Sequence, residues 1–324
     1  MHDSTSYTQN DTKKDVENKE EGIVITNKDS NTASGNTVTI EGDAEVTLKD
    51  VNINTSGAAV SVTNGADATI ELEGDNTGKS GTGNAGVNVS TDSSVTINDA
   101  DNDGSLTATG GQYGAGIGGN GSQTNGDITI NGGDIDATSG QFAAGIGAGS
   151  GVSGGSVTIN GGGNGSQTNG DITINGGTID ADGGKYGSGI GGGWGSAGGN
   201  MTISGGDLKA KGGDAGAGVG GGCEGEGGNV TISGGNTVAI GNMNGAGIGS
   251  GWKGGHGGTL TLTDGKVYAV GGGLASGIGG GYASNGADVK ISGGTVSAVA
   301  GGGAWGIGGG AAGKGGTTTI TGIL

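Results

Sequence analysis

The sequence predicts an all-β fold, namely a right-handed parallel β-helix (β-solenoid) of about nine coils, each with roughly 29 residues and three strands. Three observations support this prediction. No stretch shows helical periodicity, and 90 of the 324 residues are glycine while none is proline. A glycine-rich hexapeptide, Gly-Ala-Gly-Ile-Gly-Gly at 114–119, recurs along the chain. Its central apolar residue returns at steps of 27 to 30 residues, with one step of 44, at Val60, Val87, Ile117, Ile146, Ile190, Val219, Ile248, Ile278 and Ile307.

Each repeat predicts three short strands separated by glycine corners, as residues 200–228 show most clearly. Side chains alternate across a strand, so each strand presents two residues to the inside of the coil. The expected inward residues are Met201 and Ile203, then Leu208 and Ala210, then Ala217 and Val219. Six mostly small side chains cannot form a core alone, so successive coils must stack to bury them.

The predicted domain organisation is a flexible polar leader at 1–22 and a single β-solenoid domain at 23–324. The step of 44 residues arises because GGNGSQTNGDITINGG occurs twice, at 118–133 and 162–177. A duplication of 15 residues is too short to add a coil, so we expect residues 163–177 to be extruded as a loop. We also expect a small void or a pinched coil at Gly78, which takes the place of Leu106 in the alignment of the second strands.

Charge and composition exclude several classes of partner. The formal net charge is −18 and no basic patch offsets it, which argues against nucleic acid as a partner. No apolar run approaches the roughly 20 residues needed to span a bilayer, so membrane insertion is not expected. The single cysteine, Cys223, excludes an internal disulfide.

The outward side of the predicted first strands carries mainly threonine, serine and asparagine. We consider this face a candidate glycan-binding surface, with Thr202, Ser204, Thr231, Ser233, Thr261 and Thr263 as its central residues. A regular polar face also suits ice, although Lys290 interrupts the threonine column. The alternative explanation is that threonine is simply a favoured exposed residue in strands.

Aromatic residues fall at fixed distances from the hexapeptide centres. Four residues after the centre lie Trp194, Trp252 and Tyr282, which are candidate sugar-stacking residues. Four residues before the centre lie Tyr113, Phe142 and Tyr186. Aromatic rings one coil apart can also stack on each other, so a packing ladder at the corner is the alternative explanation for both columns.

The segment Asp99-Ala-Asp101-Asn-Asp103-Gly matches the first half of a calcium-binding loop. Alternate carboxylates can converge on one ion, so calcium is a candidate ligand of Asp99, Asp101 and Asp103. The glutamate expected at the twelfth position is replaced by Gly110, and a solvated acidic turn is the other interpretation. No converging set of acids, histidines or nucleophiles indicates catalysis, so an enzyme is not expected.

The repeated units VTISGG, LKAKGG and GAGIGGG resemble those of secreted β-helix "carbohydrate-binding domain" proteins of anaerobic Gram-positive bacteria, which have a pectate-lyase-like solenoid. The resemblance covers about residues 23–324. It implies an extracellular or cell-surface protein that binds plant or host polysaccharide without cleaving it, with calcium as a candidate ligand. A structural stalk that associates end to end is the alternative function, and ice binding is the third.

Overall fold

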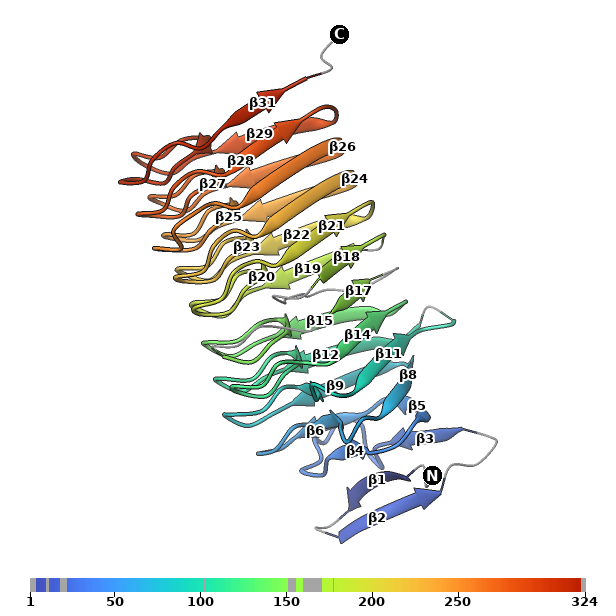
Figure 1. Ribbon diagram of the computed structural model, residues 1–324. Coiled ribbons are helices and arrows are strands. Elements are labelled where there is room, and N and C mark those ends of the chain that lie inside the picture. The colour runs from blue at the N-terminus through green and yellow to red at the C-terminus, as the bar shows by residue number, and fades with distance from the viewer. Residues whose placement is uncertain are drawn as a thin grey trace.

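The structure, a computed structural model, describes residues 4–9, 12–17, 22–101, 103–150, 156–159, 171–176 and 178–321. These residues form 31 strands and contain no helix. The strands stack as successive coils from the N-terminal to the C-terminal end (Figure 1). Each full coil contributes one strand to each of three faces, which are called wall 1, wall 2 and wall 3 in chain order. The prediction of a three-strand parallel β-solenoid is confirmed.

Wall 1 holds the first strand of each coil. Its strands are β3 (Ile23–Thr26), β5 (Ala44–Lys49), β8 (Asp67–Glu73), β11 (Ser94–Asn98), β14 (Asp127–Ile130), β17 (Val157–Ile159), β18 (Asp171–Ile174), β21 (Asn200–Ile203), the first halves of β24 (Asn229–Ile240) and β26 (Thr259–Val270), β28 (Asp288–Ile291) and β31 (Thr318–Ile320).

Wall 2 holds the second strands, and wall 3 the third. Wall 2 comprises β6 (Asn52–Asn54), β9 (Asp75–Lys79), β12 (Ser105–Thr109), β15 (Asp134–Thr138), β19 (Thr178–Asp182), β22 (Asp207–Lys211), the second halves of β24 and β26, and β29 (Thr295–Val299). Wall 3 comprises β4 (Val38–Ile40), β7 (Val60–Val62), β10 (Val87–Val89), β13 (Ile117–Gly118), β16 (Ile146–Gly147), β20 (Ile190–Gly191), β23 (Val219–Gly220), β25 (Ile248–Gly249), β27 (Ile278–Gly279) and β30 (Ile307–Gly308).

Neighbouring coils pair in parallel, and the register confirms the repeat that the sequence predicts. All nine predicted centres lie in wall 3, where Val60 pairs with Val87 and Ile190 with Val219. One earlier strand, β4, pairs Val38 with Val60 but lacks the glycine hexapeptide, which is why the repeat did not reveal it. Right-handed winding stays a prediction from the general preference of parallel crossovers.

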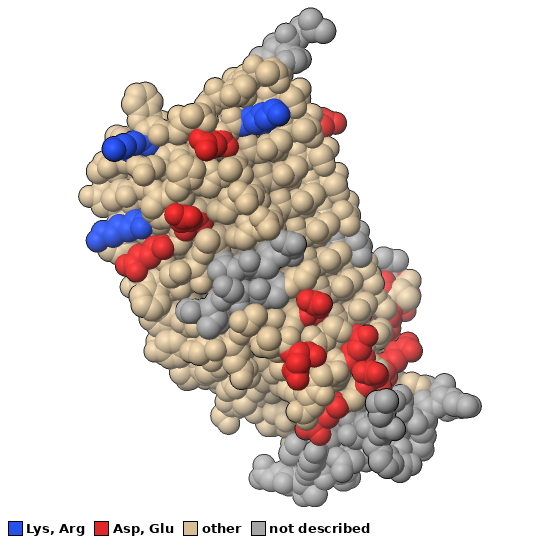
Figure 2. Space-filling model, viewed as in Figure 1, with Lys and Arg blue, Asp and Glu red and all other residues tan. Residues whose placement is uncertain are grey.

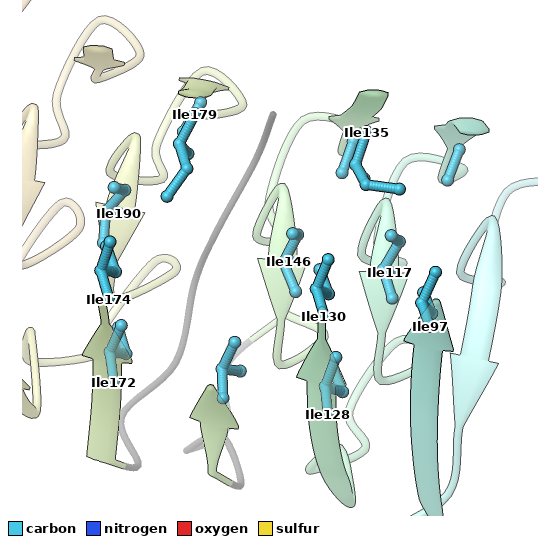
Figure 3. Close-up of a cluster of buried hydrophobic side chains, with 14 of the residues drawn as sticks. Ile97, Ile117, Ile128, Ile130, Ile135, Ile146, Ile172, Ile174, Ile179 and Ile190 are labelled. Atoms are coloured by element: carbon cyan, nitrogen blue, oxygen red, sulfur yellow. The ribbon is translucent and has the colours of Figure 1, made fainter. Parts of the chain in front are cut away.

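The core is a continuous column of small and branched side chains along the axis. In the repeat used for the prediction, all six expected inward residues are at most 2% exposed. Figure 3 shows isoleucines from the three walls pointing into the interior between the coils, including Ile128, Ile146 and Ile179. Because every coil contributes few apolar atoms, burial depends on the coils on either side.

The N-terminal segment differs from the flexible leader that the sequence predicts. Strands β1 (Ser4–Gln9) and β2 (Thr12–Glu17) pair as an antiparallel hairpin. Strand β1 also pairs antiparallel with β4, so the hairpin extends the wall 3 sheet at its N-terminal edge. The edge of β4 offers unpaired backbone groups, and this pairing satisfies them.

The expected extrusion of residues 163–177 is wrong for the part that the structure describes. Strand β18 lies within that range and pairs with β17 on one side and β21 on the other, so it is an additional rung of wall 1. The duplicated segment carries a complete first strand, and its Ile172 and Ile174 are buried in the core. Leaving both isoleucines in water would cost several kcal/mol, by the estimate of about 1.5–3 kcal/mol per side chain. Residues 163–170 and 177 lie outside the described residues.

The expectation of a void at Gly78 is also wrong. Asn76, not Gly78, pairs with Leu106, and Gly78 pairs with Ala108. Asn76 is 1% exposed, its Oδ1 accepts the amide of Val51, and its Nδ2 donates to backbone carbonyls, including that of Ser105. A Cβ added at Gly78 would lie 3.1 Å from the Cβ of Ala59, so the space is already filled.

Thr237 is the one polar residue at an inward position of β24, where Leu208 and Val267 are its neighbours in the coils below and above. Its side chain is fully buried, and its hydroxyl has no hydrogen-bond partner among the described residues. Replacing it with valine keeps the shape and removes an unsatisfied polar group. We expect Thr237→Val to raise the free energy of unfolding by about 1 kcal/mol or more, measured by urea denaturation.

The matched control for this prediction is Thr202→Val, on the outward side of wall 1. Its hydroxyl faces solvent, so the same substitution there should change stability by less than about 0.5 kcal/mol. A loss of stability in Thr237→Val would mean that the buried hydroxyl is satisfied, contrary to the structure.

Candidate binding surfaces

The outward face of wall 1 carries an uninterrupted column of threonines that is longer than the sequence predicts. Each threonine is the register partner of the next, and rungs of a parallel sheet lie about 4.8 Å apart. The column consists of Thr69, Thr96, Thr129, Thr158, Thr173, Thr202, Thr231 and Thr261, and is called the threonine ladder. Glu45 precedes it and Lys290 follows it. The additional rung β18 keeps the ladder continuous, because it brings its own threonine.

Polar side chains on both sides of the threonine ladder bond to one another between coils. On one side, Asn229 Nδ2 donates to Asn200 Oδ1 and Thr259 Oγ1 donates to Asn229 Oδ1, both at 2.9 Å. On the other side, Ser204 Oγ donates to Asn175 Oδ1 at 2.8 Å. By contrast, the ladder hydroxyls form no side-chain hydrogen bond with any described residue. The flanking bonds therefore hold a flat face whose central hydroxyls are available to a ligand.

Some of the predicted glycan-binding residues are register partners in neighbouring coils, and others are not. Thr202, Thr231 and Thr261 are in register, as predicted. Ser233 pairs with Asp264 instead of Thr263, because the register shifts between β24 and β26 after Ile232. The second polar column is therefore interrupted at the corner between walls 1 and 2, although Ser204, Ser233 and Thr263 are all exposed.

The aromatic column before the hexapeptide is a packing ladder. The rings of Tyr113 and Phe142 lie 5.1 Å apart with planes 8° from parallel, and those of Phe142 and Tyr186 lie 5.4 Å apart at 12°. Each ring uses a face to contact the next, so both faces of Phe142 are occupied. This stack also crosses the position of the duplication, because Phe142 and Tyr186 are 44 residues apart in sequence.

The tryptophans and tyrosine after the hexapeptide do not form one continuous surface. Trp194 is 43% exposed, whereas Trp252 and Tyr282 are half-buried. The position between the two tryptophans belongs to Cys223, which is 2% exposed. Lys253 Nζ lies 4.8 Å from the centre of the Trp252 ring, and the Trp252 indole N–H is buried without a partner among the described residues. Trp194 is therefore the most accessible of the three.

The two aromatic columns meet at one edge of the solenoid, which the sequence did not indicate. The amide of Cys223 donates to the carbonyl of Tyr186, and the amide of Trp252 donates to that of Ala215, both at 2.8 Å. From β13 onward the strands of wall 3 are two residues long, so the loops before and after them come into contact. Burial raises the pKa of the Cys223 thiol to about 11, so the thiol is protonated near neutral pH and is a poor nucleophile.

The three candidate calcium ligands lie together after β11. Each of Asp99, Asp101 and Asp103 has one carboxylate oxygen that lies within 4.8 Å of the corresponding oxygens of the other two. Asp99 Oδ1 also accepts the backbone amides of Asp103 and Gly104, which closes the turn. Because the carboxylates are this close, a hydrogen bond and the negative charge of Asp101 raise the pKa of Asp103. Such a set of oxygens fits a hard cation such as calcium.

Charge is distributed unevenly along the axis. Acidic side chains gather over the N-terminal coils, and lysines lie on the C-terminal coils in the view of Figure 2. Residues 1–103 hold 19 acidic residues and six lysines, whereas residues 227–324 hold two acidic residues and four lysines. Among the described residues, no helix is long and apolar enough to cross a membrane.

Comparison with known families identifies the repeat. Seven segments match the family described as Beta helix repeat, at residues 102–122, 128–150, 172–194, 202–223, 230–252, 260–282 and 289–311. The comparisons with curated proteins and with solved structures gave no match. The matched segments coincide with coils that the structure shows, with at most one match per coil. Residues 102–311 therefore contain seven copies of the β-helix repeat, in agreement with the parallel β-solenoid that the structure shows.

Proposed function

We propose that this chain is a non-catalytic binding protein that holds a polysaccharide along the threonine ladder of wall 1, at the cell surface or outside the cell. The observation that carries the proposal is the ladder itself: eight threonines in register whose hydroxyls have no side-chain partner among the described residues. A repeating face suits a repeating ligand, because each added coil offers the same hydroxyl to the next unit of the polymer.

The rigidity of the face supports the proposal. The hydrogen bonds between Asn200, Asn229 and Thr259 order the side chains before a ligand arrives, which lowers the entropy cost of binding. Individual contacts to hydroxyls are weak, and a long ligand that engages several rungs gains affinity through multivalency. Trp194, whose side chain is 43% exposed, offers an apolar ring outside the ladder.

The proposal is tested by pull-down of the chain on cellulose, chitin and insoluble xylan, in calcium and in chelator. The key variant replaces Thr173, Thr202 and Thr231 with valine, which removes three adjacent hydroxyls but keeps β-branched side chains in the sheet. We expect the wild type to be retained on at least one polymer and the triple variant to lose at least tenfold in affinity. A variant with Thr77→Val and Thr107→Val, on the outward face of wall 2, should bind as the wild type does.

The pull-down, together with thermal hysteresis and light scattering, gives a distinct outcome for each alternative function. Equal binding by the triple variant and the wild type would show that the ladder is not the site. No retention on any polymer, together with thermal hysteresis that the triple variant loses, would assign the ladder to ice instead. Retention that chelator abolishes would support calcium at Asp99, Asp101 and Asp103 as part of the function. A chain that binds no polymer but forms end-to-end assemblies in light scattering would support the stalk.

A further inference from the structure

A groove lies at the corner between walls 2 and 3, away from the threonine ladder. It has a volume of about 370 Å³, within the range of small-ligand sites. Three successive coils line it. Its polar residues are Asp182, Lys185, Lys211, Asp214 and Asn242, and its floor is the backbone of Gly183, Gly212 and Gly213.

Two of the lining residues, Lys185 and Asp214, directly precede Tyr186 and Ala215, where the aromatic stack ends. In three successive coils the corner is filled by Tyr113, Phe142 and Tyr186. In the next coil the equivalent position is Ala215, whose amide bonds to the carbonyl of Lys185 as that of Tyr186 bonds to Gln141. Alanine cannot continue the stack, which therefore ends at Tyr186. Lys185 Nζ lies there, 5.4 Å from the centre of the Tyr186 ring.

The charged groups of the groove are balanced and available. Lys209, on the same strand as Lys211, pairs with Asp180, but neither Lys185 nor Lys211 forms an ion pair with a described residue. Asp214 is oriented by Asn242, whose Nδ2 donates to Asp214 Oδ1 at 3.2 Å. The groove therefore presents two ammonium donors and two carboxylate acceptors around a glycine floor.

We propose that this groove binds a single neutral sugar residue with adjacent free hydroxyls. A hydroxyl both donates and accepts, so a pair of them can bond to an ammonium and to a carboxylate at once. An anionic sugar would face two carboxylates, a cationic one would face two ammonium groups, and an apolar ligand would leave all four charges without water. This inference rests on the proposed function, because both assign a carbohydrate ligand. It places that ligand at a second, separate site.

The test is a calorimetric or NMR titration of the whole chain with methyl glucoside, methyl galactoside, methyl mannoside and methyl xyloside, with glucuronate as the charged comparator. We expect saturable binding of at least one neutral glycoside, and at least a tenfold loss of affinity in Lys211→Met and in Asp214→Ala. Lys266→Met, which removes an exposed lysine elsewhere on wall 2, is the matched control and should bind as the wild type does. Thermal unfolding of each variant checks that the fold is kept.

The outcomes separate this inference from the proposed function. If Lys211→Met and Asp214→Ala bind the neutral glycoside as tightly as the wild type, or if glucuronate binds more tightly than any neutral glycoside, the groove assignment is overturned. If the wild type is retained on a polysaccharide but binds no glycoside at millimolar concentration, the groove assignment fails and the proposed function stands. If it binds neither, both fail.

Discussion

Replacing Gly220 with alanine is expected to lower the free energy of unfolding by about 3–5 kcal/mol, one of the largest effects of any single methyl group in this chain. Gly220 has φ = +130°, and an added Cβ would lie 2.0 Å from the carbonyl oxygen of Gly249 in the next coil. Both the backbone conformation and the contact between coils oppose the side chain. Gly191 and Gly249, the equivalent glycines in the coils on either side, show the same arrangement.

Gly308 provides a matched control for this prediction. It occupies the equivalent position with φ = +146°, but the three atoms nearest to its added Cβ all belong to Trp305 in the same coil, the closest being Cβ at 3.0 Å. Gly308→Ala should therefore cost about 1–3 kcal/mol, from the backbone strain and a close contact within its own coil. Urea denaturation of both variants measures the difference. If both variants lost the same free energy of unfolding, the contact between coils would not be the reason that this position requires glycine.

Deleting residues 163–177 is expected to stabilise the solenoid and to sharpen its unfolding transition. In the wild type, wall 1 continues through β17 and β18, whereas the strand pairing of the other two walls stops there among the residues that the structure describes. The wall 2 sheet ends at β15 and resumes at β19, and the wall 3 sheet ends at β16 and resumes at β20. In a repeat protein each coil is stabilised by its neighbours, so such an interruption is the weakest interface.

The deletion restores a step of 29 residues between Ile146 and Ile190, which allows β15 to pair with β19 as β12 pairs with β15. Four or five additional backbone hydrogen bonds would add roughly 2–5 kcal/mol. We expect the wild type to unfold in two steps and the deletion variant in one, by calorimetry and circular dichroism. A deletion variant that is less stable than the wild type would show that the additional rung compensates for the interruption of the other walls.

Much of the fold could be predicted because local spacing sets it. The hexapeptide step located nine of the strands of wall 3, and alternation along each strand identified inward residues such as Ile203 and Leu208. The stacking of Tyr113, Phe142 and Tyr186 was one of two interpretations that the spacing left open, and the ring geometry decided between them. The three aspartates after β11 also lie together, because their alternation in a tight turn brings the carboxylates to one side.

Other features depended on pairing between coils, which spacing alone does not determine. The duplicated segment could have been a loop or a rung, and burial of Ile172 and Ile174 favoured the rung. Likewise Asn76 lies in a core position because four hydrogen bonds satisfy its amide, a balance that no hydrophobicity pattern reveals. The shift that separates Ser233 from Thr263 arises at a corner where two coils have different lengths.

The sequence by itself therefore determined the coil, its period and the side of each strand that faces the core, because these follow from the alternation of side chains and from the glycine corners. Only the tertiary structure decided how the coils sit against one another. That relation sets the unbroken threonine ladder, the contact between the two aromatic columns and the groove between walls 2 and 3. Each of these surfaces combines residues from several coils, and backbone pairing and packing between coils fix their register.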